Sequence, residues 1–295
     1  MLTAPVRIAM ELSSPVQAKL PAFVRANRVL FAGDPLSEMV GPDEYIGKTI
    51  AVCGAGPSLN DERIRGVTHV FACNSALQHL LRSGVKVHAA VGIDQSPGLL
   101  REWSDVPTDI PFYVASSCDP HLIQHLITKG CRLRWFHNMV GIDGELDYYK
   151  REWPTPMFAV GMGMTVVSRF VWVAQWMGFE RIDIYGADCA FGPNDVAHAN
   201  GESAAKAYGA PVIMEGETNG RVYRTRPDML RDAVGLARMV QQSNGRFRLI
   251  GDTLPVQLLG KSEEYLNQVS RTLSPGERPP AEASPLSDPS EIPHG

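Results

Sequence analysis

The segment Gly54-Ala55-Gly56-Pro57-Ser58 has the composition of a loop that binds a phosphate group. It follows the apolar run Thr49–Cys53 and precedes a helical pattern, so a strand, a glycine turn and a helix beginning near Pro57 are predicted. The glycines allow the backbone to approach a ligand closely, and the first N–H groups of such a helix would face an anion. The dinucleotide fingerprint is incomplete, because Leu59 and Asn74 stand where a third glycine and an acidic ribose ligand belong. The turn therefore predicts a phosphate site, with an ordinary strand-to-helix turn as the alternative.

Two aspartates follow later apolar runs in the same way. Asp94 comes after Val87–Gly92, and Asp188 comes after Arg181–Tyr185. Because parallel strands end at one edge of a sheet, both carboxylates are expected at the rim that also carries Asn74. Mg²⁺ is usually held by one or two carboxylates together with phosphates and water, so both aspartates are candidate catalytic residues and metal ligands. The structural alternative for each is a helix N-cap or a turn aspartate.

His198 lies in a polar loop shortly after Asp188 and is the candidate general acid or base, because histidine titrates near neutral pH. Gly163 and Thr165 open the most apolar predicted helix, whose N-terminus is a second candidate site for an anionic group. The alternative for these two residues is close packing of a buried helix on the sheet. The arginine-rich stretch Arg221–Pro227 is predicted to be a solvated basic hairpin rather than a phosphate clamp.

These residues are positioned by short apolar runs that alternate with amphipathic stretches, the pattern of β-α-β units and a mostly parallel sheet. Strands are expected at Thr49–Cys53, His69–Cys73, Val87–Gly92, Phe112–Ala115, Arg132–Phe136, Arg181–Tyr185, Arg221–Thr225 and Phe247–Ile250. Helices are expected at Pro57–Arg65, Ser75–Ser83, Pro120–Lys129, Gly163–Met177 and Pro227–Ser243. The fold class is therefore α/β and Rossmann-like, with helices flanking the sheet.

Three regions are expected along the chain. Residues 1–47 carry helical patterning that five prolines divide into short pieces, so they are predicted to form an N-terminal helical cap. Residues 48–260 hold the regular strand and helix pattern. Residues 261–295 are expected to contain the end of a helix and a Pro-rich disordered tail, because that composition buries too little apolar surface.

The composition excludes some classes of protein. With a net charge of -4 and no run of Lys and Arg, the chain of 295 residues is not expected to bind nucleic acid. Its 5 cysteines include no C-x-x-C pair, which argues against disulfides or a thiolate zinc site and favours a reducing cytoplasm. No signal peptide is recognised at the N-terminus. The longest apolar stretch, Met162–Phe179, contains polar residues and is predicted to be a buried helix rather than a membrane span.

Several separated segments, in this order, resemble the MptE-like family, which is named for archaeal 6-hydroxymethylpterin diphosphokinase. The segments are Gly54–Leu59, Cys73–Ala76, Val91–Gln95, Met177–Phe191, His198-Ala199 and Arg221–Met229. The glycine segment and the Cys-Asn pair also resemble bacterial sialyltransferases that use CMP-sugars, and flagellin-glycosylating motility accessory factors share the MptE-like domain.

The resemblance implies a Rossmann-like nucleotide domain in a cytoplasmic transferase. The first expectation is a diphosphokinase, which would place ATP over Gly54–Ser58, with Mg²⁺ held between the phosphates and Asp94 and with Asp188 as a second ligand; a glycosyltransferase is the alternative. As a glycosyltransferase, the chain would hold a CMP-type or other nucleotide sugar on the same loop and Asn74, and His198 would act on the acceptor hydroxyl or the leaving phosphate. A nucleotide-binding protein without catalysis is the third alternative. The expected partners are a nucleotide and a small-molecule or glycan acceptor, and the oligomeric state is left open.

Overall fold

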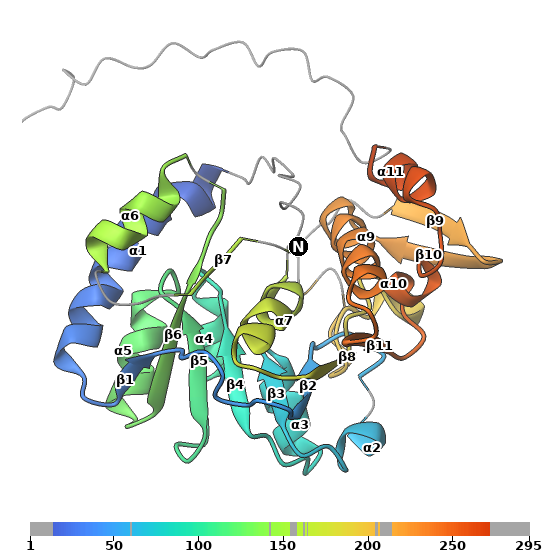
Figure 1. Ribbon diagram of the computed structural model, residues 1–295. Helices are drawn as coiled ribbons and strands as arrows, with labels where there is room; N and C mark the ends of the chain where they lie inside the picture. Colours follow the sequence, from blue (N-terminus) through green and yellow to red (C-terminus); the bar gives the residue numbers. More distant parts are fainter. Residues whose placement is uncertain are drawn as a thin grey trace, which may run out of the picture.

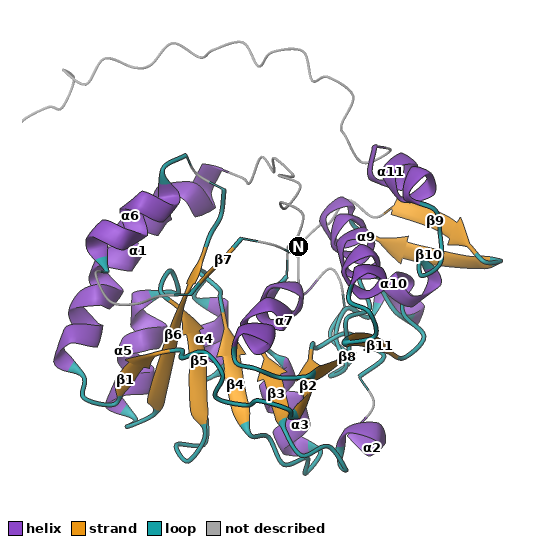
Figure 2. Ribbon diagram, viewed as in Figure 1, coloured by secondary structure: helices purple, strands orange, loops and turns teal. Residues whose placement is uncertain are grey.

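The centre of the molecule is a sheet with the strand order β1-β6-β5-β4-β3-β2-β8-β11, and a short strand, β7, pairs with β6 (Figure 1). This computed structural model describes residues 14–59, 61–141, 143–153, 158–161, 163, 165–203, 206 and 214–271. Every strand pair in the sheet is parallel. Helices flank the sheet (Figure 2), which confirms the predicted α/β class.

The predicted apolar runs are all strands. The sheet contains β1 (Ser37–Met39), β2 (Thr49–Cys53), β3 (Val70–Cys73), β4 (Ala89–Gly92), β5 (Pro111–Ala115), β6 (Arg132–Asn138), β7 (Ala159–Val160), β8 (Arg181–Tyr185) and β11 (Phe247–Ile250). The helices are α1 (Ser14–Gly33), α2 (Asp61–Ile64), α3 (Ala76–Arg82), α4 (Gly98–Glu102), α5 (Pro120–Thr128), α6 (Glu145–Glu152), α7 (Val166–Trp176), α9 (Pro227–Gln242), α10 (Leu254–Gln257) and α11 (Glu263–Arg271). A 3₁₀ turn, η1, covers Pro193–Asp195.

Aromatic side chains fill the core on both faces of the sheet. Phe170 of α7 packs on Phe71 and Tyr113 on one face, with both ring centroids 5.8 Å away. On the other face, Trp135 of β6 meets Trp153 at 5.3 Å. A parallel sheet covered on both faces needs nearly continuous apolar strands, which explains why the sequence pattern identified them.

The N-terminal segment differs from its prediction. The prolines do not divide it, because α1 is one helix of 20 residues that contains Pro21. Pro15 lies in the first turn, where a helix loses little from a missing N–H group. The segment also supplies β1, which extends the sheet beside β6. Residues 1–13 lie outside the described residues.

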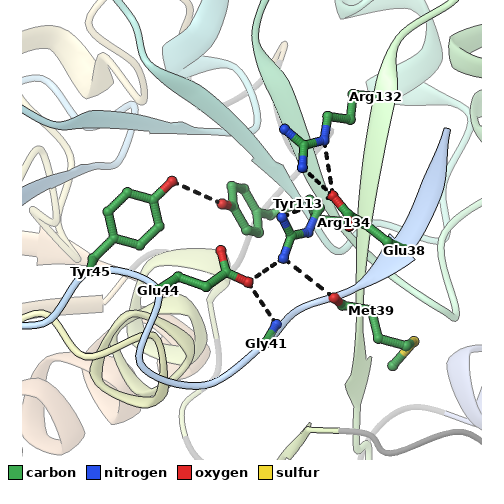
Figure 3. Close-up of polar contacts among 8 residues, drawn as sticks. All are labelled: Glu38, Met39, Gly41, Glu44, Tyr45, Tyr113, Arg132 and Arg134. Atoms are coloured by element: carbon green, nitrogen blue, oxygen red, sulfur yellow. Dashed lines mark hydrogen bonds and ion pairs between the residues drawn. The ribbon is translucent and has the colours of Figure 1, made fainter.

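Charged side chains fix β1 on β6 (Figure 3). Arg132 Nε donates to Glu38 Oε1 at 2.9 Å, and Arg134 Nη1 lies 2.9 Å from the same oxygen. Arg134 also binds Glu44, in the loop after β1, and the backbone carbonyl of Met39. The Arg134 side chain is only 11% exposed, whereas Arg132 and Glu38 are 57% and 44% exposed, so Arg134 is the buried centre of these contacts at the edge of the sheet.

The C-terminal elements gather beside β8 and β11 (Figure 1). Here β9 (Met214–Thr218) and β10 (Arg221–Thr225) form an antiparallel hairpin. Its arginines pair with carboxylates: Arg221 with Asp252, and Arg224 with Asp195. A hairpin with paired arginines agrees with the prediction for this stretch.

The last described element is α11, and residues 272–295, where the Pro-rich tail was predicted, lie outside the described residues. Within the described part of the chain, no helix combines the length and the apolar character needed to cross a bilayer.

Candidate functional site

The order of the strands marks one point on the sheet edge. The chain runs from β2 outward through β3, β4, β5 and β6, and then returns to place β8 on the other side of β2. In open α/β sheets, ligands bind beyond the carboxyl ends of the strands at such a switch point. The loops Gly54–Ser58 and Gly186–Asp188 meet there, so the predicted phosphate loop stands where the fold favours a ligand.

The glycine loop does not lead directly into a helix. Helix α2 begins at Asp61 rather than near Pro57 and has 4 residues, so that part of the prediction is wrong. Ser58, at the end of the loop, binds the carboxylate of Asp188. Its N–H group donates to both carboxylate oxygens at 3.2 Å, and its hydroxyl donates to Oδ2 at 2.8 Å. An internal carboxylate thus takes donors that were predicted to bind phosphate.

Both glycines of the loop are needed for its contact with the loop after β8. Gly54 N–H donates to the carbonyl of Tyr185 at 2.8 Å, and Gly56 N–H donates to the carbonyl of Gly186 at 2.9 Å. A Cβ on Gly54 would lie 2.6 Å from the Gly186 oxygen, and one on Gly56 would overlap Asp188 Oδ2. Close approach between two backbones therefore explains both glycines, whether or not a ligand is bound.

Burial raises the pKa of Asp188 to about 6, although the hydrogen bonds from Ser58 lower it. A phosphate bound by Ser58 would meet this carboxylate at close range. Ser58 can therefore serve a phosphate only when Asp188 turns away or becomes protonated.

The second pair at the rim is Asn74 and Asp94. Asn74 Nδ2 donates to Asp94 Oδ2 at 2.9 Å, and burial raises the pKa of Asp94. Asn74 has a φ of 46°, in the left-handed region that asparagine tolerates better than most residues. Trp103 Nε1 donates to its carbonyl at 3.1 Å. The structure thus brings together two predicted site residues from neighbouring strands.

A magnesium ion shared by Asp94 and Asp188 does not fit this geometry. Strands β3 and β2 lie between β4 and β8. At about 4.8 Å between strands, the two strand ends are about 14 Å apart, whereas Mg²⁺ needs oxygens at about 2.1 Å. Among the described residues, no group of three or more His, Cys, Asp and Glu side chains is arranged to hold a metal. Asp94 alone, together with phosphate oxygens, stays a predicted ligand.

His198 stands against the glycine loop. Its Nδ1 lies 2.8 Å from Glu202 Oε2, and the side chains of both residues are about four-fifths buried. The N–H group of the next residue, Ala199, donates to the carbonyl of Ala55 at 2.8 Å. Lys206 Nζ lies 3.7 Å from the other carboxylate oxygen of Glu202. A histidine paired with a carboxylate therefore sits beside the predicted phosphate loop.

Sequence reasoning missed Glu102 and Glu202. Burial raises the pKa of Glu102 most, His198 and Arg101 lower it, and Asp94 and Glu202 raise it further, so Glu102 belongs to the same charged cluster. The spacing of Glu202 from His198 within one loop was an available signal. Glu102 had none, because its position depends on how α4 packs.

The other predicted anion site, at the N-terminus of α7, also faces an internal carboxylate. Thr165 caps the helix by accepting from Ser168 N–H, and its hydroxyl donates to Asp232 Oδ2 at 2.8 Å. Ser168 Oγ donates to Asp232 Oδ1 at 2.8 Å. Gly163 has a φ of 91°, and a Cβ there would overlap Ser168 Oγ. These contacts cap α7 and join it to α9 rather than pack it on the sheet, and the phosphate role of Gly163 and Thr165 stays a prediction.

Comparisons with known proteins give a matching family model and similar solved structures. A family model described as 6-hydroxymethylpterin diphosphokinase MptE-like matches residues 30–194, more than half of the chain. The solved structure of the MAf glycosyltransferase from Magnetospirillum magneticum AMB-1 is similar, with a TM-score of 0.55 and 13% sequence identity. The similarity covers 86% of this chain and 42% of that chain, so this chain spans less than half of that protein. At this identity the likeness is one of fold. The comparison with curated proteins gave no match.

Proposed function

We propose that this chain, which belongs to the MptE-like family, is a nucleotide-dependent transferase whose site lies at the carboxyl edge of the sheet. The observation that carries the proposal is the His198–Glu202 pair beside the Gly54–Ser58 loop. This arrangement sets a candidate base next to a candidate phosphate loop at the switch point of the fold. The family is described by a diphosphokinase and the similar solved structure is a glycosyltransferase, and both are transferases.

The charges around the site favour a sugar over a diphosphate as the transferred group. Transfer from ATP requires the charge of several phosphates to be balanced. In the described part of the chain, Glu102, Glu202 and Asp94 are the acidic groups near His198, and the cations beside them are Arg101, which lowers the pKa of Glu102, and Lys206, 3.7 Å from Glu202. A CMP-type nucleotide sugar would bring one phosphate to the loop and needs less compensating charge.

In the proposed reaction, an acceptor hydroxyl attacks the anomeric carbon of the nucleotide sugar. The bond between that carbon and the phosphate oxygen breaks, and its electron pair leaves with the nucleotide. The hydroxyl proton passes to His198, whose Nδ1–H donates to Glu202 and whose Nε2 acts as the base. Ser58, released from Asp188, donates to the departing phosphate.

Diphosphate transfer from ATP is the second candidate, and the family description favours it. A substrate hydroxyl would then attack the β-phosphorus and release AMP. Asp94 would hold Mg²⁺ together with the phosphates, and the ion would balance part of the phosphate charge. The glycine loop and His198 would keep their roles.

Ligand binding and turnover together test the proposal. CMP, CDP, UDP and ATP are compared by thermal shift, with and without Mg²⁺, because a ligand that binds the folded state raises its stability. We expect CMP compounds to raise the melting temperature without metal. His198→Ala should keep this shift and lose about 100-fold or more of nucleotide release from a CMP-sugar.

His121→Ala is the matched control, because the His121 side chain is 86% exposed and pairs only with Asp119 among the described residues. A shift seen only with ATP and Mg²⁺ would replace sugar transfer with diphosphate transfer. Nucleotide binding without turnover of any donor would support a non-catalytic nucleotide-binding protein. No shift in melting temperature with any nucleotide would contradict sugar transfer, diphosphate transfer and non-catalytic binding alike.

A further inference from the structure

The loops after three neighbouring strands, β3, β4 and β5, contain buried polar atoms that lack a hydrogen-bond partner. Among the described residues, these atoms are Asn74 Oδ1 after β3, both amide atoms of Gln95 after β4, and Ser117 Oγ after β5. Ser117 is completely buried. Buried polar groups are normally paired, and leaving them unpaired is costly. A polar ligand bound at this edge would supply partners to these four atoms.

The three loops are joined into one wall. The Asn74 amide donates to Asp94, and Asn74 N–H donates to the carbonyl of Val91 at 2.8 Å. On the other side, Asp119 N–H donates to the Asp94 carbonyl at 3.1 Å. The carboxylate of Asp94 is therefore held in a fixed place between β3 and β5.

The chemistry of this wall selects a ligand that donates hydrogen bonds. Asp94 offers carboxylate oxygens, and Asn74 offers Oδ1 because its amide group already donates to Asp94. An anion would be repelled by Asp94, which has no cationic partner within the described part of the chain. Hydroxyl groups satisfy such acceptors without a charge.

The position of the wall relative to the glycine loop suggests which hydroxyls these are. In nucleotide-binding sheets the phosphate lies on the first loop, and an acidic residue after the next strand binds the ribose. The next strand here, β3, is followed by Asn74, so the sequence lacks that acidic residue in its usual place. In the structure, an acidic residue comes instead from the loop after β4, because the Asn74 amide holds the carboxylate of Asp94 beside the end of β3.

We propose that Asp94, positioned by Asn74, binds the ribose hydroxyls of the nucleotide, and that Gln95 and Ser117 contact the nucleoside beyond it. The inference rests on the proposed function, since it assumes that a nucleotide occupies the glycine loop. It gives Asp94 a role that needs no metal ion.

The test compares CMP with 2′-deoxy-CMP by calorimetry in EDTA. We expect the wild-type protein to bind CMP about 10-fold more tightly, because the deoxy form lacks a hydroxyl that a carboxylate accepts. Asp94→Asn should weaken CMP about 10-fold, leave 2′-deoxy-CMP nearly unchanged and so remove the preference. Asp105→Asn makes the same charge change on a fully exposed side chain and should keep the preference.

A second variant guards against misfolding of the first. Asn74→Gly removes the amide that holds Asp94, while glycine accepts the positive φ, so the preference for CMP should fall about 3-fold. Equal affinity of the wild-type protein for both nucleotides would overturn the inference, even if the protein transfers sugar. An effect of Asp94→Asn that appears only with Mg²⁺ would overturn it in favour of a metal ligand. A clear ribose preference without turnover would support it and contradict the proposed transferase.

Discussion

Replacement of Asp188 by Asn should change how stability depends on pH. Burial raises the pKa of this carboxyl from 3.8 to about 6 in the folded protein. The folded state therefore binds the proton more tightly than the unfolded state, and the wild-type protein loses stability as pH rises through this interval. A shift of about 2 pKa units corresponds to about 3 kcal/mol in full, of which about 2 kcal/mol falls between pH 4.5 and pH 7.5.

Urea unfolding of both proteins at a series of pH values measures this effect. The difference between Asp188→Asn and wild type should grow by about 2 kcal/mol in favour of the variant from pH 4.5 to pH 7.5. Because other titrating groups contribute to both proteins, the difference isolates Asp188. Ser58→Ala removes the hydroxyl that donates at 2.8 Å and should make the pH dependence steeper. If the difference in unfolding free energy between the two proteins stays constant with pH, the raised pKa of Asp188 is refuted.

Three further predictions concern packing around the site. Gly56→Ala should lower the free energy of unfolding by about 3 kcal/mol in urea, because its Cβ would overlap Asp188; a variant as stable as wild type would contradict that contact. Gly235→Ala, at an open and exposed position in α9, is its control and should gain about 1 kcal/mol. Asp232→Ala should cost about 3 kcal/mol by calorimetric unfolding, because it strips the first turn of α7 of an acceptor for two hydroxyls. Arg134→Ala should speed amide exchange in β1, and unchanged exchange would show that the ion pairs do not hold that strand.

The strands were predictable because a parallel sheet covered on both faces leaves continuous apolar runs in the sequence. The elements that escaped prediction lack such runs. β1 and β7 have 3 and 2 residues, and β9 contains only one apolar side chain, Met214, so their existence depends on the strand beside them. Helix α1 was missed for the opposite reason, because its prolines suggested breaks that the folded chain does not show.

The site was predictable as a set of residue types at strand ends but not as a set of partners. That Asp188 would bind Ser58, or that Asn74 would hold Asp94, depends on how loops far apart in the sequence bend over the sheet edge. The shared magnesium site is the clearest case. Both carboxylates were expected at one rim, and the order of the strands, which the sequence pattern does not reveal, separates them by two strands.

The sheet contains a strand that the family model does not cover, and this affects where the protein can be divided. The match ends at residue 194, whereas β11 pairs with β8 from Phe247 onward. A fragment limited to the matched residues would expose β8 as an open edge, a common start of aggregation, and would remove Asp232 from α7. The segment that defines the family is therefore shorter than the smallest unit expected to fold, and a fragment meant to stay monomeric must extend through β11.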